Sequence, residues 1–334
     1  MIRLGIDATS VAPEGKGIAR VQRGTVRALA KLRRFELVVY ARLPDELPEV
    51  RARRVAWRPT LAWEQLGLAR AAREVDVLLT WTERLPLVGS GRFVVWMFEP
   101  PTHRIEQNRQ VGARAWQRGS DALTSLLWRR SLGRAAVVLT GSQATADAVR
   151  DVTPARPLYP GLDERFSPGT AARGGSVLHI GSNDPRDDTT TALAAARAAG
   201  ERLVVVGGYA GPAEGAELAG RVTDDELVDH YRRADAFLDT SLYEGFGFQV
   251  LEAMACGTPV VASDTTSIPE LVGDAALLCP PGDVEAFAAA LRRLRTEAEL
   301  VDDLRRRGLA RAAEFTWERT AEQLADAVEE AARA

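Results

Sequence analysis

Lysine is almost absent from this sequence of 334 residues, since only Lys16 and Lys31 occur among 43 basic side chains. Beyond Lys31, the positive group that binds a phosphate must therefore be an arginine side chain or backbone N–H groups, such as those at the start of a helix. A basic surplus is absent too, because 46 acidic residues give a formal net charge of −3. The chain thus has no general affinity for polyanions, and we expect no nucleic-acid partner.

Cysteine and long apolar runs are also scarce. The two cysteines, Cys256 and Cys279, lack the spacing of metal ligands. They are also too few for a disulfide framework, and this scarcity fits a reducing compartment. The first residues, MIRLGIDATS, lack the apolar core of a signal peptide, and no apolar run approaches the about 18 residues of a membrane span. We therefore expect a cytoplasmic protein, with peripheral contact at the inner membrane face left open.

Short β-branched runs alternate with amphipathic runs rich in Ala, Leu and Arg. The spacing predicts a strand at Arg3–Ala8, helices at Ile18–Leu32 and Trp63–Glu74, and further strands at Leu37–Tyr40, Asp76–Thr80, Phe93–Phe98 and Ala135–Thr140. After a segment rich in Pro and Gly, residues 153–175, a second alternating series begins. This predicts α/β architecture with two Rossmann-like domains, 1–160 and 161–315, and a last helix at about 316–334 that packs back on the first.

One segment, YEGFGFQVLEAMACGTP, follows the predicted strand DAFLDT. Its helix is expected to begin near Phe246 or Gly247 and to end before Cys256. Gly245 and Gly247 let the backbone approach a ligand closely, and the first helical turn presents free N–H groups at the positive end of the helix dipole. Such a helix start suits a diphosphate.

Two glutamates of this segment need an explanation. Glu252 lies among apolar neighbours inside the predicted helix, where a buried carboxylate without a partner is costly. It must accept hydrogen bonds either from a protein donor or from a ligand, and the hydroxyls of a ribose are suitable donors. Glu244 stands in the loop before the helix, as a solvated turn residue or as a ligand contact.

The stretch EGFGFQVLEAMACGTPVVAS resembles the E-x7-E signature of retaining glycosyltransferases with the GT-B fold, of the large family four type. Further segments resemble the same family in the same order: GIDATSVAPEGKGIARV, LAWEQLGLARAAREVDVLL, YPGLDERFSP, GRVTDDELVDHYRRADAFL and SIPELVGDAALLCPPGD. The resemblance implies a GT-B fold, with two Rossmann-like domains whose parallel sheets face across a deep cleft. The N-terminal domain would bind the acceptor and the C-terminal domain the nucleotide-sugar donor.

The resemblance also implies roles for individual residues. Glu244 would contact the donor sugar and Glu252 the ribose of the nucleotide. The base would lie near Arg221 and Val222, and the glycine loop at Gly17 and Ile18 would approach the sugar phosphate. The amides that would bind the phosphates belong to Phe246, Gly247, Phe248 and Gln249.

The sequence departs from the family pattern in both domains. Where many members carry an Arg and a Lys for the diphosphate, this chain has Ser182 and Asp187. Arg186 stands between them, either to take over this role or as a surface arginine. Where members often have His-Asp after an N-terminal strand, this chain has Phe98 followed by Glu99, and His103 comes four residues later. Glu99 and His103 are candidates for the vacant catalytic role, although His103 also fits an ordinary loop residue.

We therefore expect a metal-independent retaining hexosyltransferase, without a cofactor. It would move a sugar from a nucleoside-diphosphate-sugar donor to a hydroxyl of a saccharide, lipid-linked or natural-product acceptor. The alternative is a catalytically degenerate GT-B protein that only binds nucleotide sugars. A nicotinamide-dependent dehydrogenase is disfavoured, because Gly15-Lys16-Gly17 after the first strand lacks the third glycine of the dinucleotide fingerprint.

Overall fold

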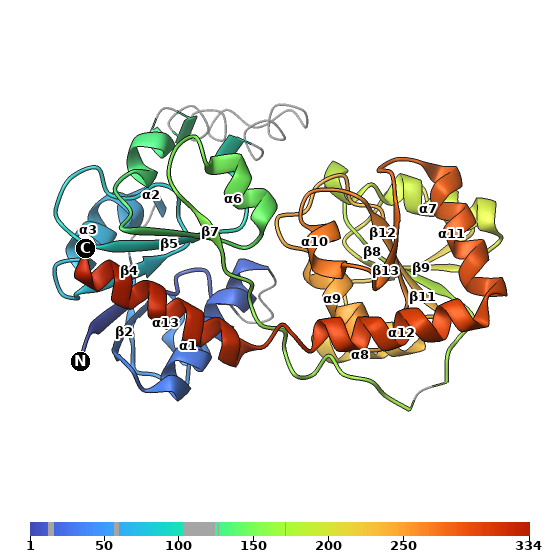
Figure 1. The fold of residues 1–334 in the computed structure, drawn as a ribbon, viewed down its shortest axis with the longest axis horizontal. Coiled ribbons are helices and arrows are strands. Elements are labelled where there is room, and N and C mark those ends of the chain that lie inside the picture. Colours follow the sequence, from blue (N-terminus) through green and yellow to red (C-terminus); the bar gives the residue numbers. More distant parts are fainter. Residues whose placement is uncertain (13–16, 57–59, 103–123, 126, 171) are drawn as a thin grey trace. The chain divides into compact units, whose positions relative to one another are not determined.

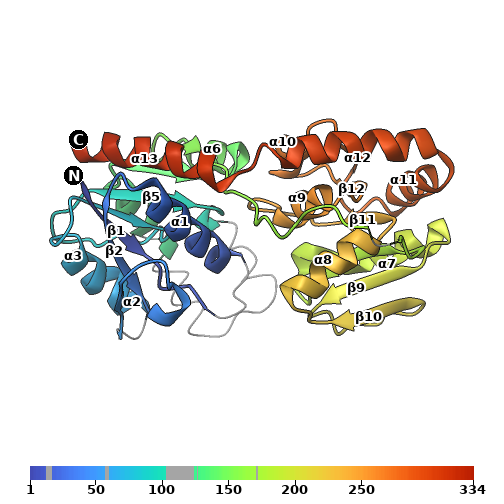
Figure 2. The same ribbon diagram turned by 90° about the horizontal axis from the view of Figure 1, so that it is seen from below.

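The protein is described by a computed structural model that covers residues 1–12, 17–56, 60–102, 124–125, 127–170 and 172–334. The chain forms two compact units, Met1–Gly161 with Thr316–Ala334 (unit 1) and Leu162–Phe315 (unit 2). Each unit is a parallel sheet with helices packed against it (Figures 1 and 2). The predicted α/β class with two parallel-sheet domains is confirmed.

Unit 1 contains a seven-stranded sheet in the order β3-β2-β1-β4-β5-β6-β7. Its strands are β1 (Arg3–Asp7), β2 (Glu36–Ala41), β3 (Ala52–Arg54), β4 (Val77–Thr80), β5 (Phe93–Met97), β6 (Val137–Thr140) and β7 (Arg156–Pro157). All residues of β4, β5 and β6 are buried, as expected for parallel strands that are covered on both faces. Because β2 and β4 pair on opposite sides of β1, the strand order reverses at the β1–β4 junction.

The helices of unit 1 come from both ends of the chain. In the described part of the chain they include α1 (Ile18–Leu32), η1 (Pro44–Glu46), α2 (Thr60–Ala62), η2 (Trp63–Gly67), α3 (Leu68–Ala71), α6 (Gln143–Val149) and α13 (Trp317–Arg333). Helix α13 packs on α1 and against β4, β5 and β6 (Figure 1). The Trp317 ring occupies the space over Gly24, where a Cβ would come within 2.1 Å of it. The Thr320 hydroxyl donates to the Tyr159 carbonyl at 2.8 Å.

Unit 2 has a six-stranded parallel sheet in the order β10-β9-β8-β11-β12-β13. The strands are β8 (Val177–Gly181), β9 (Leu203–Gly207), β10 (Ala216–Gly220), β11 (Ala236–Asp239), β12 (Val260–Ser263) and β13 (Ala276–Cys279). The helices are η3 (Pro185–Asp187), α7 (Thr189–Ala199), α8 (Asp224–Arg233), α9 (Phe248–Ala255), α10 (Ile268–Val272), α11 (Val284–Thr296) and α12 (Ala298–Ala312). In this sheet the strand order reverses between β8 and β11.

The structure differs from the sequence expectation mainly at sheet edges and in one helix. Strands β3, β7 and β10 were not expected, because edge strands are short and partly solvated and so carry little apolar signal. The single helix expected at 63–74 is instead α2, a π-helical turn η2 and α3. Within η2 the Trp63 ring lies over Gly67, where a Cβ would come within 2.1 Å of it.

Candidate active site

Two loops meet beyond the carboxyl ends of β8 and β11, at the point where the strand order of unit 2 reverses. This is where open parallel sheets usually bind ligands. The loop after β11 donates from the Leu242 N–H to the Arg186 carbonyl at 2.7 Å. The Thr240 hydroxyl bonds to the carbonyls of Asp187 and Asp188 at 3.1 and 2.9 Å. The sequence-predicted residues Arg186 and Glu244 therefore lie on loops that are joined directly.

Glu244 is half-buried and stands among other carboxyl groups. Burial and the nearby carboxylates of Asp239 and Asp187 raise its pKa to about 8, while Arg186 and Ser241 oppose the shift. The Ser241 hydroxyl lies 3.3 Å from Glu244 Oε1. At neutral pH this carboxyl group therefore keeps its proton and can donate a hydrogen bond as well as accept one.

The backbone of Glu244 is held by two hydroxyls that the sequence analysis missed. Its N–H donates to Thr266 Oγ1 at 3.0 Å, and its carbonyl accepts from Thr266 Oγ1 at 2.8 Å and from Ser267 Oγ at 3.0 Å. Thr266 has a φ of 45°, which is unfavourable for a β-branched residue. Such strain persists only where surrounding contacts impose it and is frequent at functional sites.

Helix α9 begins at Phe248, after Gly247 with a φ of 105°. Within the described residues no side chain caps this start, whereas α7, α8 and α11 each have an Asp or Thr cap. A Cβ at Gly247 would come within 2.7 Å of Ile268, so only glycine fits here. The Phe246 ring is buried against Phe248 and Phe315, so a ligand would meet only its backbone, and the side chains of Phe248 and Gln249 are half-buried.

Glu252 lies in the second turn of α9 and is 2 % exposed. The Tyr231 hydroxyl, from α8, donates to its Oε2 at 3.1 Å. Of the two alternatives for this carboxylate, the structure thus provides a protein donor. The sequence could not identify Tyr231, because it is 21 positions away and belongs to another helix.

Asp187 accepts a hydrogen bond from the Ser182 hydroxyl at 2.5 Å. Burial raises its pKa, and the Asp184 carboxylate adds to this, while the Ser182 bond opposes it. Arg186 is engaged as well, since its guanidinium contacts Asp184 Oδ2 at 2.8 Å. Burial acts against ionisation of Asp184, but the bonds from Arg186 prevail and lower its pKa. A diphosphate at Arg186 would therefore compete with Asp184 for the Nε and Nη2 groups of the guanidinium.

The other predicted residues lie elsewhere. Val222 is half-buried between β10 and α8, next to the exposed Arg221. In unit 1, Gly17 has a φ of 56° and precedes α1, whose first residue is Ile18. Glu99 is half-buried two residues after β5. His103 lies outside the described residues.

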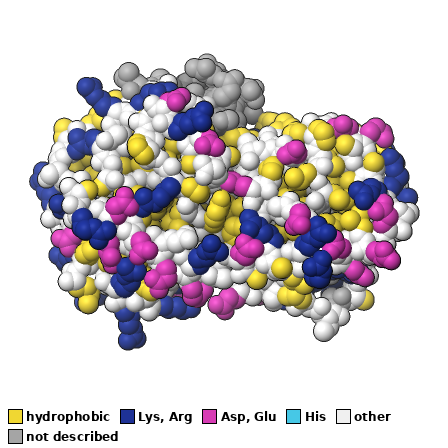
Figure 3. All heavy atoms as spheres, viewed as in Figure 1, with side chains coloured by type: hydrophobic (Ala, Val, Ile, Leu, Met, Phe, Trp, Pro, Cys, Tyr) yellow, Lys and Arg dark blue, Asp and Glu magenta, His cyan; other side chains and the backbone are white. Residues whose placement is uncertain are grey.

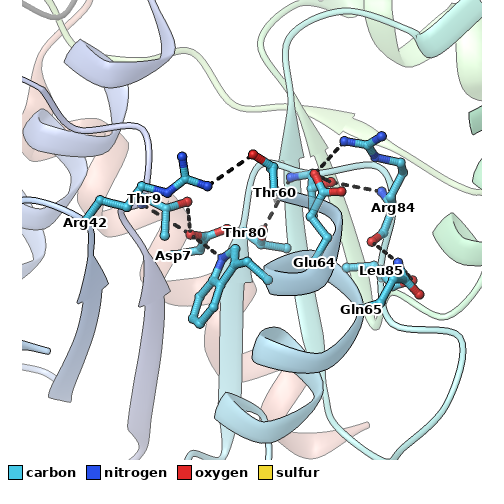
Figure 4. A network of polar contacts seen from close by, with 11 residues as sticks. Asp7, Thr9, Arg42, Thr60, Glu64, Gln65, Thr80, Arg84 and Leu85 are labelled. Carbon is cyan, nitrogen blue, oxygen red and sulfur yellow. Dashed lines mark hydrogen bonds and ion pairs between the residues drawn. The ribbon is translucent and has the colours of Figure 1, made fainter. Parts of the chain in front are cut away.

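Unit 1 has a polar network at its own strand-order reversal, beyond β1 and β4 (Figure 4). Asp7 accepts from Thr9 Oγ1 at 2.7 Å, Thr80 Oγ1 at 3.0 Å and Trp63 Nε1 at 3.2 Å. Burial raises the pKa of Asp7, against these bonds. The network fixes the start of the loop that leads from β1 towards Gly17, and the sequence analysis did not single out Asp7.

Comparison with known proteins extends these observations. Residues 176–297 match the family model described as "Glycosyl transferases group 1". Over 108 residues the chain is 44 % identical to O-antigen chain mannosyltransferase B from Escherichia coli, covering 32 % of this chain and 28 % of that protein. Over 227 residues it is 33 % identical to D-inositol 3-phosphate glycosyltransferase from Saccharomonospora viridis, covering 56 % of this chain and 51 % of that protein. The chain thus matches about half, or less, of the length of these curated relatives.

Solved structures match along nearly the whole chain. Sucrose-phosphate synthase from Thermosynechococcus elongatus superposes with a TM-score of 0.78 at 19 % identity, covering 99 % of both chains. The Anabaena protein HepE, solved with UDP and glucose, gives 0.73 at 17 % identity and covers 98 % of this chain and 100 % of that one. The two units therefore have the GT-B fold, and residues 176–297 of unit 2 are similar to the glycosyl transferases of group 1.

Proposed function

We propose that the protein is a retaining glycosyltransferase that moves a hexosyl group from a nucleoside-diphosphate sugar to a hydroxyl group of an acceptor. The observation that carries the proposal is the joining of the Arg186 loop and the Glu244 loop beside the uncapped start of α9. This site lies within the segment that is similar to group 1 glycosyl transferases. In our proposal unit 2 binds the donor and unit 1 the acceptor.

In the proposed reaction the bond between the anomeric carbon and the diphosphate oxygen breaks with oxocarbenium character. The acceptor oxygen bonds to the same face, and its proton passes to the departing phosphate. The α9 amides at Gly247, Phe248 and Gln249, together with Arg186, stabilise the charge that grows on the leaving group. No metal or cofactor takes part, because these dipoles and the guanidinium supply the positive potential.

The remaining residues orient the donor. Glu244 exchanges hydrogen bonds with hydroxyls of the sugar, and its raised pKa lets it act as a donor as well. Glu252 binds the ribose, and the base lies near Val222. Ser182 lies beside the diphosphate, and its hydroxyl bonds to Asp187. Gly17 and Ile18 approach the sugar phosphate, and Glu99 and His103 are the candidates from unit 1 for contact with the sugar.

The relatives suggest which donors to test first. Several are named as mannosyltransferases, and HepE was solved with UDP-glucose. We therefore propose a mannosyl or glucosyl donor and a saccharide, lipid-linked or natural-product acceptor.

The alternative is a protein that binds nucleotide sugars without transferring them. It is favoured by the pairing of Arg186 with Asp184 and by the carboxylate at Asp187, because both reduce the positive potential for a leaving diphosphate. Under this alternative, ligand binding would not displace Asp184 from Arg186.

The test measures nucleotide binding by calorimetry with UDP, GDP and dTDP, and donor hydrolysis or transfer with the corresponding mannose and glucose donors. We expect binding of one nucleotide and turnover of its sugar, and loss of turnover in E244A with a folded protein by circular dichroism. E252A should weaken nucleotide binding by about 1–3 kcal/mol. Unchanged turnover in E244A would refute the proposed site, and binding without any turnover would favour the alternative.

A further inference from the structure

A loop of unit 1 lies between two helical segments and presents large apolar side chains to solvent. Gln65, in η2, donates from Nε2 to the Arg84 carbonyl at 3.0 Å (Figure 4). Its Oε1 accepts from the Leu87 N–H at 3.2 Å. On the other side, Arg134 donates to the carbonyls of Leu87 and Gly89 at 3.2 and 2.6 Å. Residues 60–71, 84–92 and 127–134 therefore form one continuous surface.

Four large apolar side chains on this surface are exposed, although their burial would stabilise the folded chain. The exposed fractions are 37 % for Leu61, 56 % for Leu66, 37 % for Leu87 and 70 % for Val88. Single exposed leucines are ordinary, but a group of them on one surface marks an interaction site. The bond from the Leu87 N–H to Gln65 brings the chain at Leu87 and Val88 next to the turn that carries Leu66. The π-helical turn contributes to this arrangement, since it buries Trp63 and Gly67 while Leu66 faces outward.

Arginines dominate the exposed charges of the same surface, and Arg70 pairs with the half-buried Glu74, just beyond the first segment, at 3.8 Å. Within these three described segments the exposed charged side chains are all arginines: Arg70, Arg92, Arg129, Arg130 and Arg134. The one acidic residue of the segments, Glu64, is buried and paired with Arg84 at 2.8 Å. A chain with a net charge of −3 thus collects positive charge around apolar side chains.

We infer that this leucine–arginine surface, Leu61, Leu66, Leu87 and Val88 with the five arginines, docks on an anionic phospholipid membrane. Apolar side chains enter the boundary between head groups and acyl chains, while arginines contact lipid phosphates. A second copy of the chain packed through the same surface would place these arginines against each other, whereas an anionic membrane offers both lipid phosphates and an apolar layer. The inference does not depend on the proposed activity.

The experiment is co-sedimentation of the full chain with vesicles of phosphatidylcholine, alone or with phosphatidylglycerol in a ratio of about 2:1. We expect the wild type to bind the anionic vesicles at least about tenfold more tightly, with binding reduced at about 0.5 M salt. R70E/R130E should lose about tenfold or more in affinity, and L66S/V88S about tenfold. L218S and R54E, which change exposed residues outside this surface, should bind as the wild type does.

Circular dichroism melts of all variants establish that they fold. Absence of binding to anionic vesicles, equal binding to phosphatidylcholine alone, or wild-type binding by both surface variants would each overturn the inference. If the wild type self-associates in gel filtration, L66S/V88S does not, and neither binds vesicles, the occupant is a second copy and the inference is wrong.

Discussion

Glu244 differs from an ordinary loop glutamate because its surroundings disfavour its ionised form. It shares its surroundings with the carboxylates of Asp187 and Asp239, and Arg186 and the Ser241 hydroxyl offset them in part. Like charges at close range prevent neighbouring carboxyl groups from ionising together. The proton on Glu244 is thus a property of the folded chain, with consequences for stability as well as for donor binding.

The first prediction concerns pH. In the unfolded chain Glu244 ionises near its ordinary pKa, and in the folded chain near 8. The protonated Glu244 therefore contributes fully to the free energy of unfolding of the wild type below about pH 4.5. This contribution falls as the pH rises towards 8, and the free energy of unfolding does not change further with this group above pH 8. E244Q cannot ionise, so its free energy of unfolding relative to that of the wild type should rise by about 1–2 kcal/mol between pH 4.5 and 8, a figure reduced because Glu244 is partly exposed.

Urea unfolding at pH 5, 7 and 8.5 measures this difference in the free energy of unfolding, with E214Q at an exposed turn as control. Parallel curves for E244Q and the wild type would show that Glu244 is not perturbed.

The second prediction concerns Thr266 as a positioning residue for Glu244. T266A removes the two hydrogen bonds between Thr266 and the Glu244 backbone, leaves the one from Ser267, and should reduce kcat by about ten- to a hundredfold. T266G also relieves the unfavourable φ, so it should be at least as stable as T266A and equally slow. T266S keeps the hydroxyl and should stay within about threefold of the wild-type kcat. Steady-state kinetics measure kcat for the three variants, and circular dichroism checks that each variant folds. A wild-type kcat in T266A would contradict the positioning role of Thr266.

At the scale of elements, the contact of α1 with α13 depends on the absence of a side chain at Gly24. A helix interior normally favours Ala over Gly by about 1 kcal/mol. Here the Trp317 ring fills the position of the missing methyl group, so packing between the helices outweighs helix propensity. The half-buried Arg34 adds ion pairs to the exposed Glu322 and the half-buried Glu329 on α13, and ion pairs at the surface contribute little.

G24A should accordingly destabilise unit 1 by about 1–3 kcal/mol, because the indole ring cannot move aside as a flexible side chain would. Thermal unfolding followed by near-ultraviolet circular dichroism detects the change, since Trp317 lies at the contact. The matched control is G133A, whose added methyl would meet the nearest atom at 3.5 Å and should be close to neutral. W317A should recover part of the loss when combined with G24A, and additivity of the two changes would contradict the steric explanation.

At the scale of the whole molecule, each unit has a core of its own. In unit 1, Trp63, Phe93 and Trp128 belong to one cluster, and in unit 2 Phe287, Leu203 and Val261 belong to another. Acidic and basic side chains are interspersed over the face shown in Figure 3, in keeping with the small net charge. Separate cores allow a ligand to stabilise one unit without the other.

A nucleoside diphosphate should therefore protect one unit selectively. Hydrogen exchange with saturating UDP or GDP should slow in residues 181–188 and 240–252 and stay unchanged in β2. Nucleotide at about a hundred times its Kd should stabilise unit 2 by about 2.7 kcal/mol. E252A serves as a control with weakened binding, and protection confined to unit 1 would contradict the assignment of the donor site.

The sequence by itself determined the two alternating α/β series, α1 at Ile18–Leu32, the interior strands, and the end of α9 before Cys256. It could do so because apolar periodicity and glycine stops are local signals. The segment around Glu244 and Glu252 was also identified locally, since carboxylates in an apolar run are unusual.

Only the tertiary structure decided what these carboxylates contact. Tyr231 bonds to Glu252 and Thr266 holds the backbone of Glu244, although each comes from a different element. Edge strands, the π-helical turn over Gly67 and the pairing of Asp187 with Ser182 were likewise set by packing and by contacts between elements. The physical reason is that hydrogen-bond partners and burial depend on which elements adjoin in space, and periodicity along one segment carries no information about its neighbours.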